Sequence, residues 1–375
     1  MKNSSLYLDY NATTPLKPQV RALMHDIFSD IGNASSVHGF GRAARGRIEY
    51  AREQVASLAG VFSNQVIFTS GATESNNTVL KHFSGQRVFV SAIEHSSVLE
   101  SVPDVQKIPV TKEGIIDMAT FEALLHNGPP PALISIMLVN NETGVIQPVA
   151  EMARLAKKIH PGVFIHTDAV QAAGRIPIDF PALHVDYLSL SAHKMGGPQG
   201  VGTLIVAPGA SSAVLLHGGG QEKRQRAGTE NVAGIAGFGL AAELAVKDMA
   251  AFQKLATWRD RLEAALKAAA PEAVFFGQTA PRVANTSNIA LPGAPAEMQL
   301  MALDLEGIAV SSGSACSSGT IKPSHVLLAM SADSGLAASA LRISLGWSTT
   351  ESEVARLIGV WTQMRNRIKN DREKK

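Results

Sequence analysis

Residues 186–206 read DYLSLSAHKMGGPQGVGTLIV, and this stretch decides the fold class. The two apolar runs at 186–190 and 202–206 have the length and composition of buried strands. Between them lie Lys194 and three glycines, which are typical of a loop and not of a helix. The stretch therefore predicts two strands joined by a loop that carries a lysine.

The same pattern recurs on the N-terminal side of this stretch. Strand candidates alternate with helical segments from about residue 20 to 250, which is typical of βαβ units. The further strand candidates are residues 65–69, 87–91, 132–139 and 163–167. The helices are predicted at residues 41–58, 75–82 and 150–159. We therefore expect an α/β fold with a mainly parallel central sheet flanked by helices.

A second, smaller α+β domain is expected after an Ala- and Leu-rich helix at residues 232–269, which Pro271 ends. Its predicted strands and helices are residues 274–276, 286–290, 297–304, 341–345 and 350–368. A chain of 375 residues exceeds the size at which one hydrophobic core usually suffices. We expect a large domain of residues 15–255 and a small domain of residues 1–14 plus 256–375.

Composition narrows the functional class. Lys plus Arg total 34 against 32 Asp plus Glu, so the net charge of +2 favours neither nucleic acid nor an anionic membrane as a partner, and a small-molecule substrate is expected. The uncharged window at residues 195–221 contains proline and several glycines, which argue against a membrane span. The N-terminus shows no secretory signal and Cys316 is the single cysteine, so a reducing, cytoplasmic location is expected.

Three motifs follow strand candidates, where ligands bind in open α/β sheets. In SGATESNN, residues 70–77, the backbone N–H groups around Ala72 and Thr73 at a helix N-terminus suit an anion such as phosphate, although a capped turn explains them equally well. In HTDAVQ, residues 166–171, Asp168 either caps a helix or meets a cation. In SAHK, Lys194 follows a buried strand, which is costly unless the amine is paired or used covalently.

Together, an anion cradle, a carboxylate and a lysine match what pyridoxal 5'-phosphate requires. At this point the chain resembles the class V aminotransferase-like enzymes, and among them the NifS/IscS-type cysteine desulfurases. The resemblance covers nearly the whole chain. The matching motifs, in order, are LDYNATTP, GNASSVHGFG, FTSGATES, EHSSVL, VNNETG, HTDAVQ, SAHK, RAGTENVAG, SSGSAC and LRISLG.

The resemblance implies a pyridoxal-phosphate-dependent transferase of fold type I. It implies that Lys194 holds the cofactor as a Schiff base and that Asp168 pairs with its ring nitrogen. It also implies that His95 stacks on the ring and moves a proton. The other residues that the resemblance assigns to the cofactor are Gln171 and Asn141 near the phenolic oxygen, Ala72, Thr73, Ser191 and His193 at the phosphate, and Thr229 from the second subunit of a homodimer.

Arg342 is the expected ligand of the substrate carboxylate, since a guanidinium offers it a bidentate match, and Asn33 is expected to assist. A structural ion pair is the other explanation for Arg342.

Cys316 lies in SSGSACSSG, residues 311–319, a polar loop that we expect to be exposed. A buried small hydrophobe is the ordinary alternative for one cysteine. The resemblance implies that its thiolate attacks the sulfur of bound L-cysteine, so that L-alanine leaves and a persulfide remains. The sulfur then passes to an acceptor protein such as an Fe–S scaffold, for cluster or thio-cofactor and tRNA biosynthesis. The thiol is also expected to serve as a shared iron–sulfur ligand, which makes Cys316 the one expected metal-binding residue.

Two other functions stay open. One is a related pyridoxal-phosphate enzyme, such as a selenocysteine lyase or an aminotransferase, for which Cys316 is dispensable. The other is a non-catalytic partner in Fe–S assembly.

Overall fold

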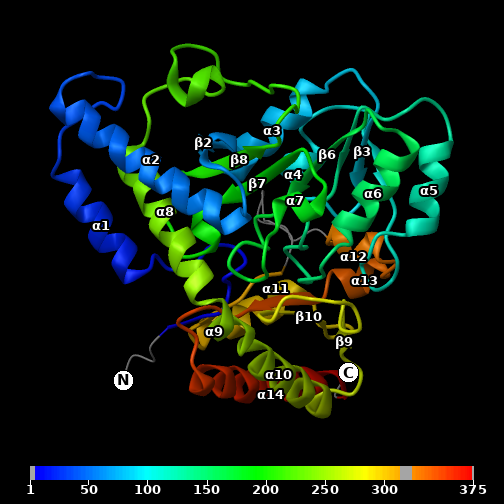
Figure 1. The fold of residues 1–375 in the computed structure, drawn as a ribbon. Helices are drawn as coiled ribbons and strands as arrows, with labels where there is room; N and C mark the ends of the chain where they lie inside the picture. The colour runs from blue at the N-terminus through cyan, green and yellow to red at the C-terminus, as the bar shows by residue number, and fades with distance from the viewer. Residues whose placement is uncertain (1–4, 313–322, 374–375) are drawn as a thin grey trace.

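The computed structural model describes residues 5–312 and 323–373, with side chains up to residue 370. Its centre is a seven-stranded sheet of order β2-β8-β7-β6-β5-β3-β4 (Figure 1). The strands from β7 to β4 run parallel, while β8 is antiparallel to both β7 and β2. The strands are β2 (Val66–Thr69), β3 (Val88–Ser91), β4 (Gln106–Ile108), β5 (Leu133–Ser135), β6 (Phe164–Asp168), β7 (Tyr187–Ser191) and β8 (Gly202–Val206).

Helices cover both faces of this sheet. On one face, α3 (Ala72–His82) and α4 (Ser96–Leu99) pack their apolar side chains on Val88 and Val90. Phe89, which points the other way, belongs to the main core with residues of α2 (Gly39–Ala59), α6 (Val149–Ile159) and α8 (Val232–Lys247). The outer helices are α1 (Pro18–Phe28), which packs on α8, and α5 (Met118–His126), which packs on α6.

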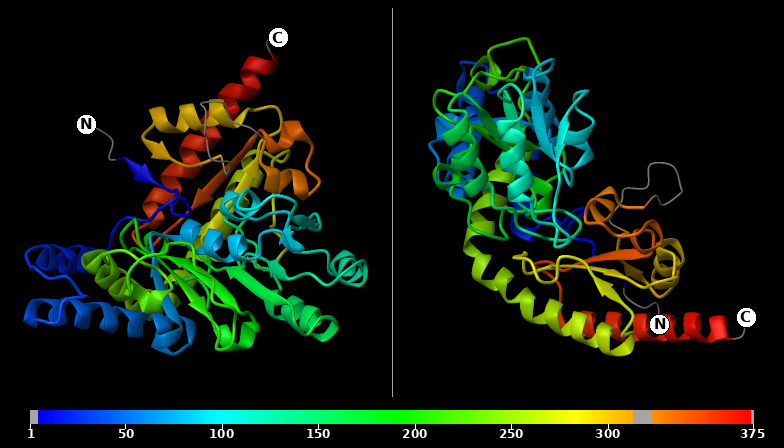
Figure 2. Two further views of the ribbon diagram at one scale, coloured as in Figure 1. Left: turned by 90° about the horizontal axis from the view of Figure 1, so that it is seen from above. Right: turned by 90° about the vertical axis from the view of Figure 1, so that its right-hand side faces the viewer.

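A second core surrounds a small antiparallel sheet of order β12-β10-β9, on the lower side of Figure 1 and the right-hand view of Figure 2. The strands are β9 (Val274–Phe275), β10 (Thr286–Ala290) and β12 (Ala340–Ser344), and the helices are α10 (Leu255–Ala269), α11 (Ala296–Leu305) and α14 (Glu351–Glu373). Trp361 of α14 is fully buried there. The N-terminal strand β1 (Leu6–Tyr7) pairs in parallel with β11 (Ile308–Ala309) and adds Leu6 and Leu8 to this core.

The expected fold class is confirmed, with two differences in detail. The single helix predicted at residues 232–269 is divided into α8, α9 (Met249–Gln253) and α10, with Asp248 and Lys254 between them. The strand predicted at 132–139 ends at Ser135. The short elements are η1 (Ser63–Gln65), α7 (Phe180–Leu183), η2 (Ala192–Lys194), η3 (Gln221–Arg224), α12 (His325–Ala329) and α13 (Ser334–Ala337).

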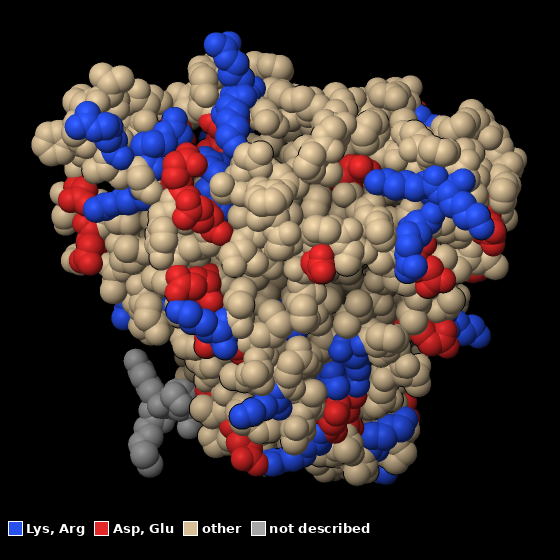
Figure 3. Space-filling model, viewed as in Figure 1, with Lys and Arg blue, Asp and Glu red and all other residues tan. Residues whose placement is uncertain are grey.

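Basic and acidic side chains are interspersed over the face drawn in Figure 3, with broad uncharged areas between them. Among the described residues, no helix combines the length and the apolar character that crossing a bilayer requires.

Candidate active site

Asp168 and Lys194 lie at the carboxyl ends of the adjacent strands β6 and β7. Asp168 is only 7% exposed, and its two oxygens have separate donors. Asn76 Nδ2 donates to Oδ2 at 2.8 Å, and the backbone N–H of Val170 donates to Oδ1 at 3.0 Å. These bonds fix the orientation of the carboxylate, and no lysine or arginine in the described part of the chain forms an ion pair with it.

The Lys194 amine is held by the main chain. Its Nζ donates to the carbonyl oxygens of Asn11 at 2.6 Å and Ala12 at 2.7 Å. Burial, followed by the positive charges of Arg175 and Arg342, lowers the pKa of Lys194 to about 7 against the opposing effect of nearby carboxylates. A large fraction of this amine is therefore neutral and nucleophilic near neutral pH.

Asn11 connects the site residues, and it is 1% exposed. Its carbonyl also accepts Gln171 Nε2 at 3.0 Å, and its side-chain Nδ2 donates to the carbonyl of Asn141 at 3.0 Å. The Oε1 atom of Gln171 is buried and has no hydrogen-bond partner within the described part of the chain. An unpaired buried acceptor of this kind indicates that a donor is missing from the site.

His95 is the N-cap of α4, and its Nδ1 accepts the backbone N–H of Ser97 at 3.1 Å. The neutral ring therefore carries its proton on Nε2. The side chain is exposed to solvent on one side. Partial desolvation lowers the pKa of His95, and the positive charge of Lys194 lowers it further, while the negative charge of Asp168 opposes both effects. The ring is therefore largely neutral at pH 7.

The expected phosphate residues come from two elements. Ala72 and Thr73 form the first turn of α3, where backbone N–H groups have no partner inside the helix. Ser191 ends β7 and is buried, and His193 follows it in η2. His193 Nδ1 lies 3.1 Å from Thr13 Oγ1, and burial lowers the pKa of His193 to about 4, so the ring is neutral.

Arg342 of β12 forms a structural ion pair, which was the other explanation considered for this residue. Its Nη2 lies 2.7 Å from Asp9 Oδ1, and its Nη1 donates to the carbonyl of Asn141 at 3.2 Å. Its Nε is buried without a partner in the described structure. A carboxylate ligand would therefore have to share Arg342 with Asp9.

Two of the expected residues are not drawn into this group. Asn33 is exposed between α1 and α2, and its Oδ1 accepts the N–H of Ser35 at 2.9 Å. That local turn satisfies the side chain, and Asn33 forms no hydrogen bond to Arg342 or Asn141. Thr229 is exposed in the loop before α8. Cys316 lies outside the described residues.

The arrangement fits pyridoxal phosphate on its own chemistry. The free first turn of α3 suits the phosphate, the oriented Asp168 suits a protonated ring nitrogen, and the orphaned Gln171 Oε1 requires a donor. Lys194 supplies an amine with a lowered pKa. By contrast, the described residues contain no cluster of three or more His, Cys, Asp or Glu that could hold a metal ion.

The sequence motifs did not single out four of the residues that shape this site. These are Asp9, Asn11, Asn76 and Arg175. Asp9 and Asn11 lie within LDYNATTP and Asn76 within the extended SGATESNN stretch, but asparagines are common in turns and helices and their spacing carries no signal.

Residues 6–357 match the family model described as aminotransferase class-V. The chain belongs to this family. It is 41% identical over 364 residues to the cysteine desulfurase IscS of Dictyoglomus turgidum, covering 93% of this chain and 91% of that protein. The X-ray structure of a NifS-like protein from Rickettsia africae superposes with a TM-score of 0.90 at 36% identity, over 96% of this chain and 99% of that one.

Another solved structure, titled SspA in complex with cysteine, superposes with a TM-score of 0.76 at 30% identity, over 91% of this chain and 99% of that one. The family assignment and the fold therefore agree with each other and with the geometry of the site.

Proposed function

We propose that this protein is a pyridoxal-phosphate-dependent cysteine desulfurase that converts L-cysteine to L-alanine. The observation that carries this proposal is the grouping of Lys194 and Asp168 at adjacent strand ends. Lys194 acts electrostatically on His95, and Arg342 acts on Lys194. The full-length similarity to a cysteine desulfurase and to a structure titled as a cysteine complex supports the substrate. The relatives reported above favour this reading over the selenocysteine lyase, aminotransferase and non-catalytic alternatives.

When bound, pyridoxal phosphate supplies an electron sink for charge that develops on the amino acid. The chain's residues then have distinct tasks. Lys194 would hold the cofactor and, when its amine is free and largely neutral, would take a proton from the substrate Cα. Asp168, held by Asn76, would keep a proton on the ring nitrogen, and His95 would offer its Nε2 proton to the cofactor or substrate. Arg342 orients the substrate carboxylate in competition with Asp9.

Cys316 is the proposed sulfur carrier. Its thiolate attacks the substrate sulfur, the bond between that sulfur and the substrate Cβ breaks, and the sulfur remains on Cys316 as a persulfide. The substrate Cβ takes up a proton, and the product leaves as L-alanine. An acceptor protein, such as an Fe–S scaffold, then receives the sulfur. Iron–sulfur ligation by Cys316 and a cytoplasmic location belong to the same proposal.

The proposed assembly is a homodimer in which Thr229 reaches the phosphate of the second subunit. Its exposure in one isolated chain supports this role, because the residue is free to meet another copy. Within each chain we propose a large cofactor-binding unit of residues 15–255 and a small unit of residues 1–14 and 256–375. The separate core around Trp361 supports that division.

The decisive experiment uses the cofactor-loaded protein with L-cysteine. We expect alanine in solution and the mass of one added sulfur on a peptide containing Cys316, the only thiol of the chain. Cys316→Ser should keep the cofactor absorbance and lose both the added sulfur and most of the alanine, whereas Ser317→Ala should lose neither. Undiminished alanine from Cys316→Ser would refute the persulfide route, and no alanine from the wild type would refute the function.

A further inference from the structure

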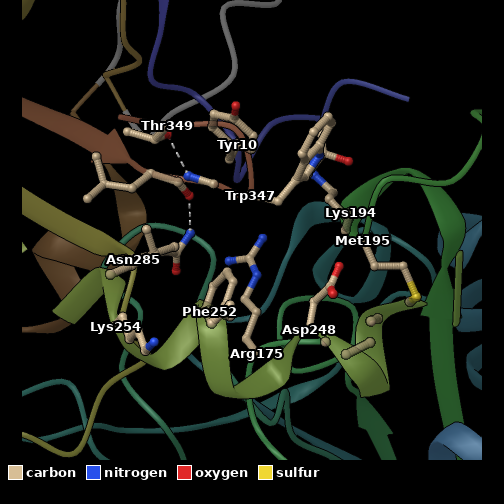
Figure 4. Close-up of a pocket in the computed structure, with 18 of the residues that line it drawn as sticks. Tyr10, Arg175, Lys194, Met195, Asp248, Phe252, Lys254, Asn285, Trp347 and Thr349 are labelled. Atoms are coloured by element: carbon tan, nitrogen blue, oxygen red, sulfur yellow. Dashed lines mark hydrogen bonds between the residues drawn. The ribbon is translucent and has the colours of Figure 1, made fainter. Parts of the chain in front are cut away.

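A cavity of about 410 Å³, partly open to solvent, lies between the large and the small sheet (Figure 4). Its lining comes from the N-terminal segment, the turn after β6, the α8–α10 region and the segment after β12. Cavities of this size accommodate small organic molecules. The geometry of the lining therefore raises the question of what it would bind.

Arg175 is the main polar feature of this cavity. Arg175 is only 2% exposed, and Figure 4 shows its guanidinium extending between Phe252 and Asp248. Nη1 donates to Asn11 Oδ1 at 2.6 Å, and within the described part of the chain Arg175 forms no ion pair. A buried cation without a carboxylate is costly unless an anion reaches it.

The conformation of the turn before Arg175 directs it inward. Gly174 has φ +73, and a Cβ there would lie 2.9 Å from the Cβ of Ala245. Glycine is therefore the residue that allows this turn to pack against α8. The turn places Arg175 rigidly, so its remaining donors do not need to be ordered when a ligand arrives.

The charges around the cavity favour an anion. The cations that line it are Lys17, Arg175 and Lys254, against one acidic residue, Asp248, while the Lys194 amine that also lines it is in large part neutral near neutral pH. Asp248 is already paired with Lys17 at 2.6 Å. The lining therefore has a net positive charge that the surrounding side chains do not neutralise.

The remaining walls are apolar and largely aromatic. Tyr10, Phe252, Trp258 and Trp347 contribute rings, and Leu255 and Leu345 contribute aliphatic surface. Gly346 lets the Tyr10 ring lie directly on the backbone, because a Cβ at Gly346 would fall 1.8 Å from Tyr10 Cδ1. A flat apolar group has more complementary surface here than a chain of hydroxyl groups.

The cavity is separate from the site proposed for the cofactor. Lys194 is the only one of the expected cofactor and substrate residues that lines it. Its Nζ donates to the carbonyls of Asn11 and Ala12. The Asn11 carbonyl also accepts Nε2 of the site residue Gln171. The amine thus touches the backbone segment that lies between the two spaces.

From this combination we infer that the cavity is a second binding site, for a small carboxylate with a flat apolar body, whose carboxylate pairs with Arg175. This inference does not depend on the proposed desulfurase activity. A bound carboxylate would offset the charge of Arg175, one of the two cations that lower the pKa of Lys194. Binding would therefore raise the pKa of the amine.

The test is calorimetric titration of the cofactor-loaded protein with phenylacetate, and with phenylacetamide as the neutral probe of nearly equal shape. We expect saturable binding of phenylacetate and at least about 10-fold weaker binding of the amide, as expected when a charged hydrogen bond is lost. Equal affinity for the two probes, or no saturable binding of phenylacetate at millimolar concentrations, would overturn the inference.

Variants locate the bound probe. Arg175→Gln, which can still donate to Asn11, should weaken phenylacetate binding at least about 10-fold, and Arg175→Lys should weaken it less. Ala251→Trp places a bulky ring at the exposed lining residue Ala251 and should abolish binding while leaving Arg175 in place. Arg342→Gln should leave it unchanged. Binding that depends on Arg342 and not on Arg175 would place the probe in the substrate site and refute the second site.

Discussion

Asn76 illustrates how one buried side chain prepares the site for chemistry. Its Nδ2 donates both to Asp168 Oδ2 at 2.8 Å and to Ser97 Oγ at 2.9 Å. Ser97 in turn contacts Nδ1 of His95 at 2.9 Å. One asparagine therefore connects the Asp168 carboxylate with the His95 imidazole, the two side chains that we propose would contact the cofactor ring.

Removing this donor should weaken cofactor binding. A hydrogen bond to a charged group contributes about 1.5–3 kcal/mol, so Asn76→Ala should raise the dissociation constant of pyridoxal phosphate about 10- to 100-fold. Absorbance titration of the cofactor-free protein measures this change. Asn77→Ala is the matched control, since Asn77 donates to the carbonyls of Thr73 and Ser97 and not to Asp168. An equal effect of the two variants would contradict the role of Asn76.

The Lys194 amine offers a prediction about pH. With the pKa of Lys194 lowered to about 7, the amine of the cofactor-free protein should be mostly protonated at pH 6 and mostly neutral at pH 8. Its acetylation by dilute acetic anhydride, followed by peptide mass spectrometry, should rise with a midpoint near pH 7. Exposed Lys112 in the same sample is the internal reference. A Lys194 profile that coincides with that of Lys112 would show that burial does not lower its pKa.

At the scale of elements, the strands were well predicted and the breaks were not. All six strands predicted for the large sheet are present, because each is a short apolar run between polar loops. β4, with the sequence QKI, was missed because it is short and polar at an edge of the sheet. The breaks at Asp248 and Lys254 had no glycine or proline to mark them.

The break at Asp248 has a tertiary cause. Lys17 is buried, with its side chain 7% exposed, and its Nζ lies 2.6 Å from Asp248 Oδ2. The carboxylate reaches Lys17 from the junction of α8 and α9, where Asp248 has φ −89 and ψ 0. Such a contact between distant residues leaves no periodicity in the sequence.

This ion pair should respond asymmetrically to mutation. Asp248→Ala leaves the Lys17 cation buried without its partner, whereas Lys17→Met replaces it with an apolar side chain of similar length. Because Asp248 is half exposed, we expect a loss of about 1–2 kcal/mol for Asp248→Ala and less for Lys17→Met. Urea midpoints of the two variants and of the double variant measure this order. A greater loss for Lys17→Met would show that the pair itself stabilises the junction.

At the scale of the whole molecule, the N-terminal segment joins the two sheets. Asp9 pairs with Arg342 of the small sheet, and Thr14 donates its N–H to the carbonyl of His193 beside the large one. The motif LDYNATTP was recognised only through its family resemblance. Its residues look like an ordinary polar turn, and their structural role depends on partners more than 100 positions away.

Stability of the whole chain should fall in mild acid, and His166 is one cause. Burial lowers the pKa of His166 to about 3, so the folded protein keeps the ring neutral, while the unfolded chain takes up a proton below about pH 6.5. The contribution of His166 to the free energy of unfolding is fully present above about pH 6.5 and declines as the pH falls toward 3. At pH 5 the expected loss from His166 is about 2 kcal/mol.

The difference in urea midpoint between pH 7 and pH 5 measures this loss. His166→Gln should reduce the difference, because glutamine can still bond Ser135 and Ser189 but does not titrate. His126→Gln, at an exposed position, should leave it unchanged. An identical pH dependence in His166→Gln and the wild type would rule out this contribution.

Among the residues that the structure describes, the Lys194 amine is anchored by two peptide carbonyls and by no side chain. Any amino acid at positions 11 and 12 carries the same two oxygen atoms, but the position of the Asn11 carbonyl also depends on its side chain, which donates to the Asn141 carbonyl and accepts Arg175 Nη1. An insertion or deletion between Leu8 and Thr14 would carry both oxygens away from the amine. The contact with the amine therefore depends on the number of residues in this segment and on the identity of Asn11, while the side chain of Ala12 takes no part in it.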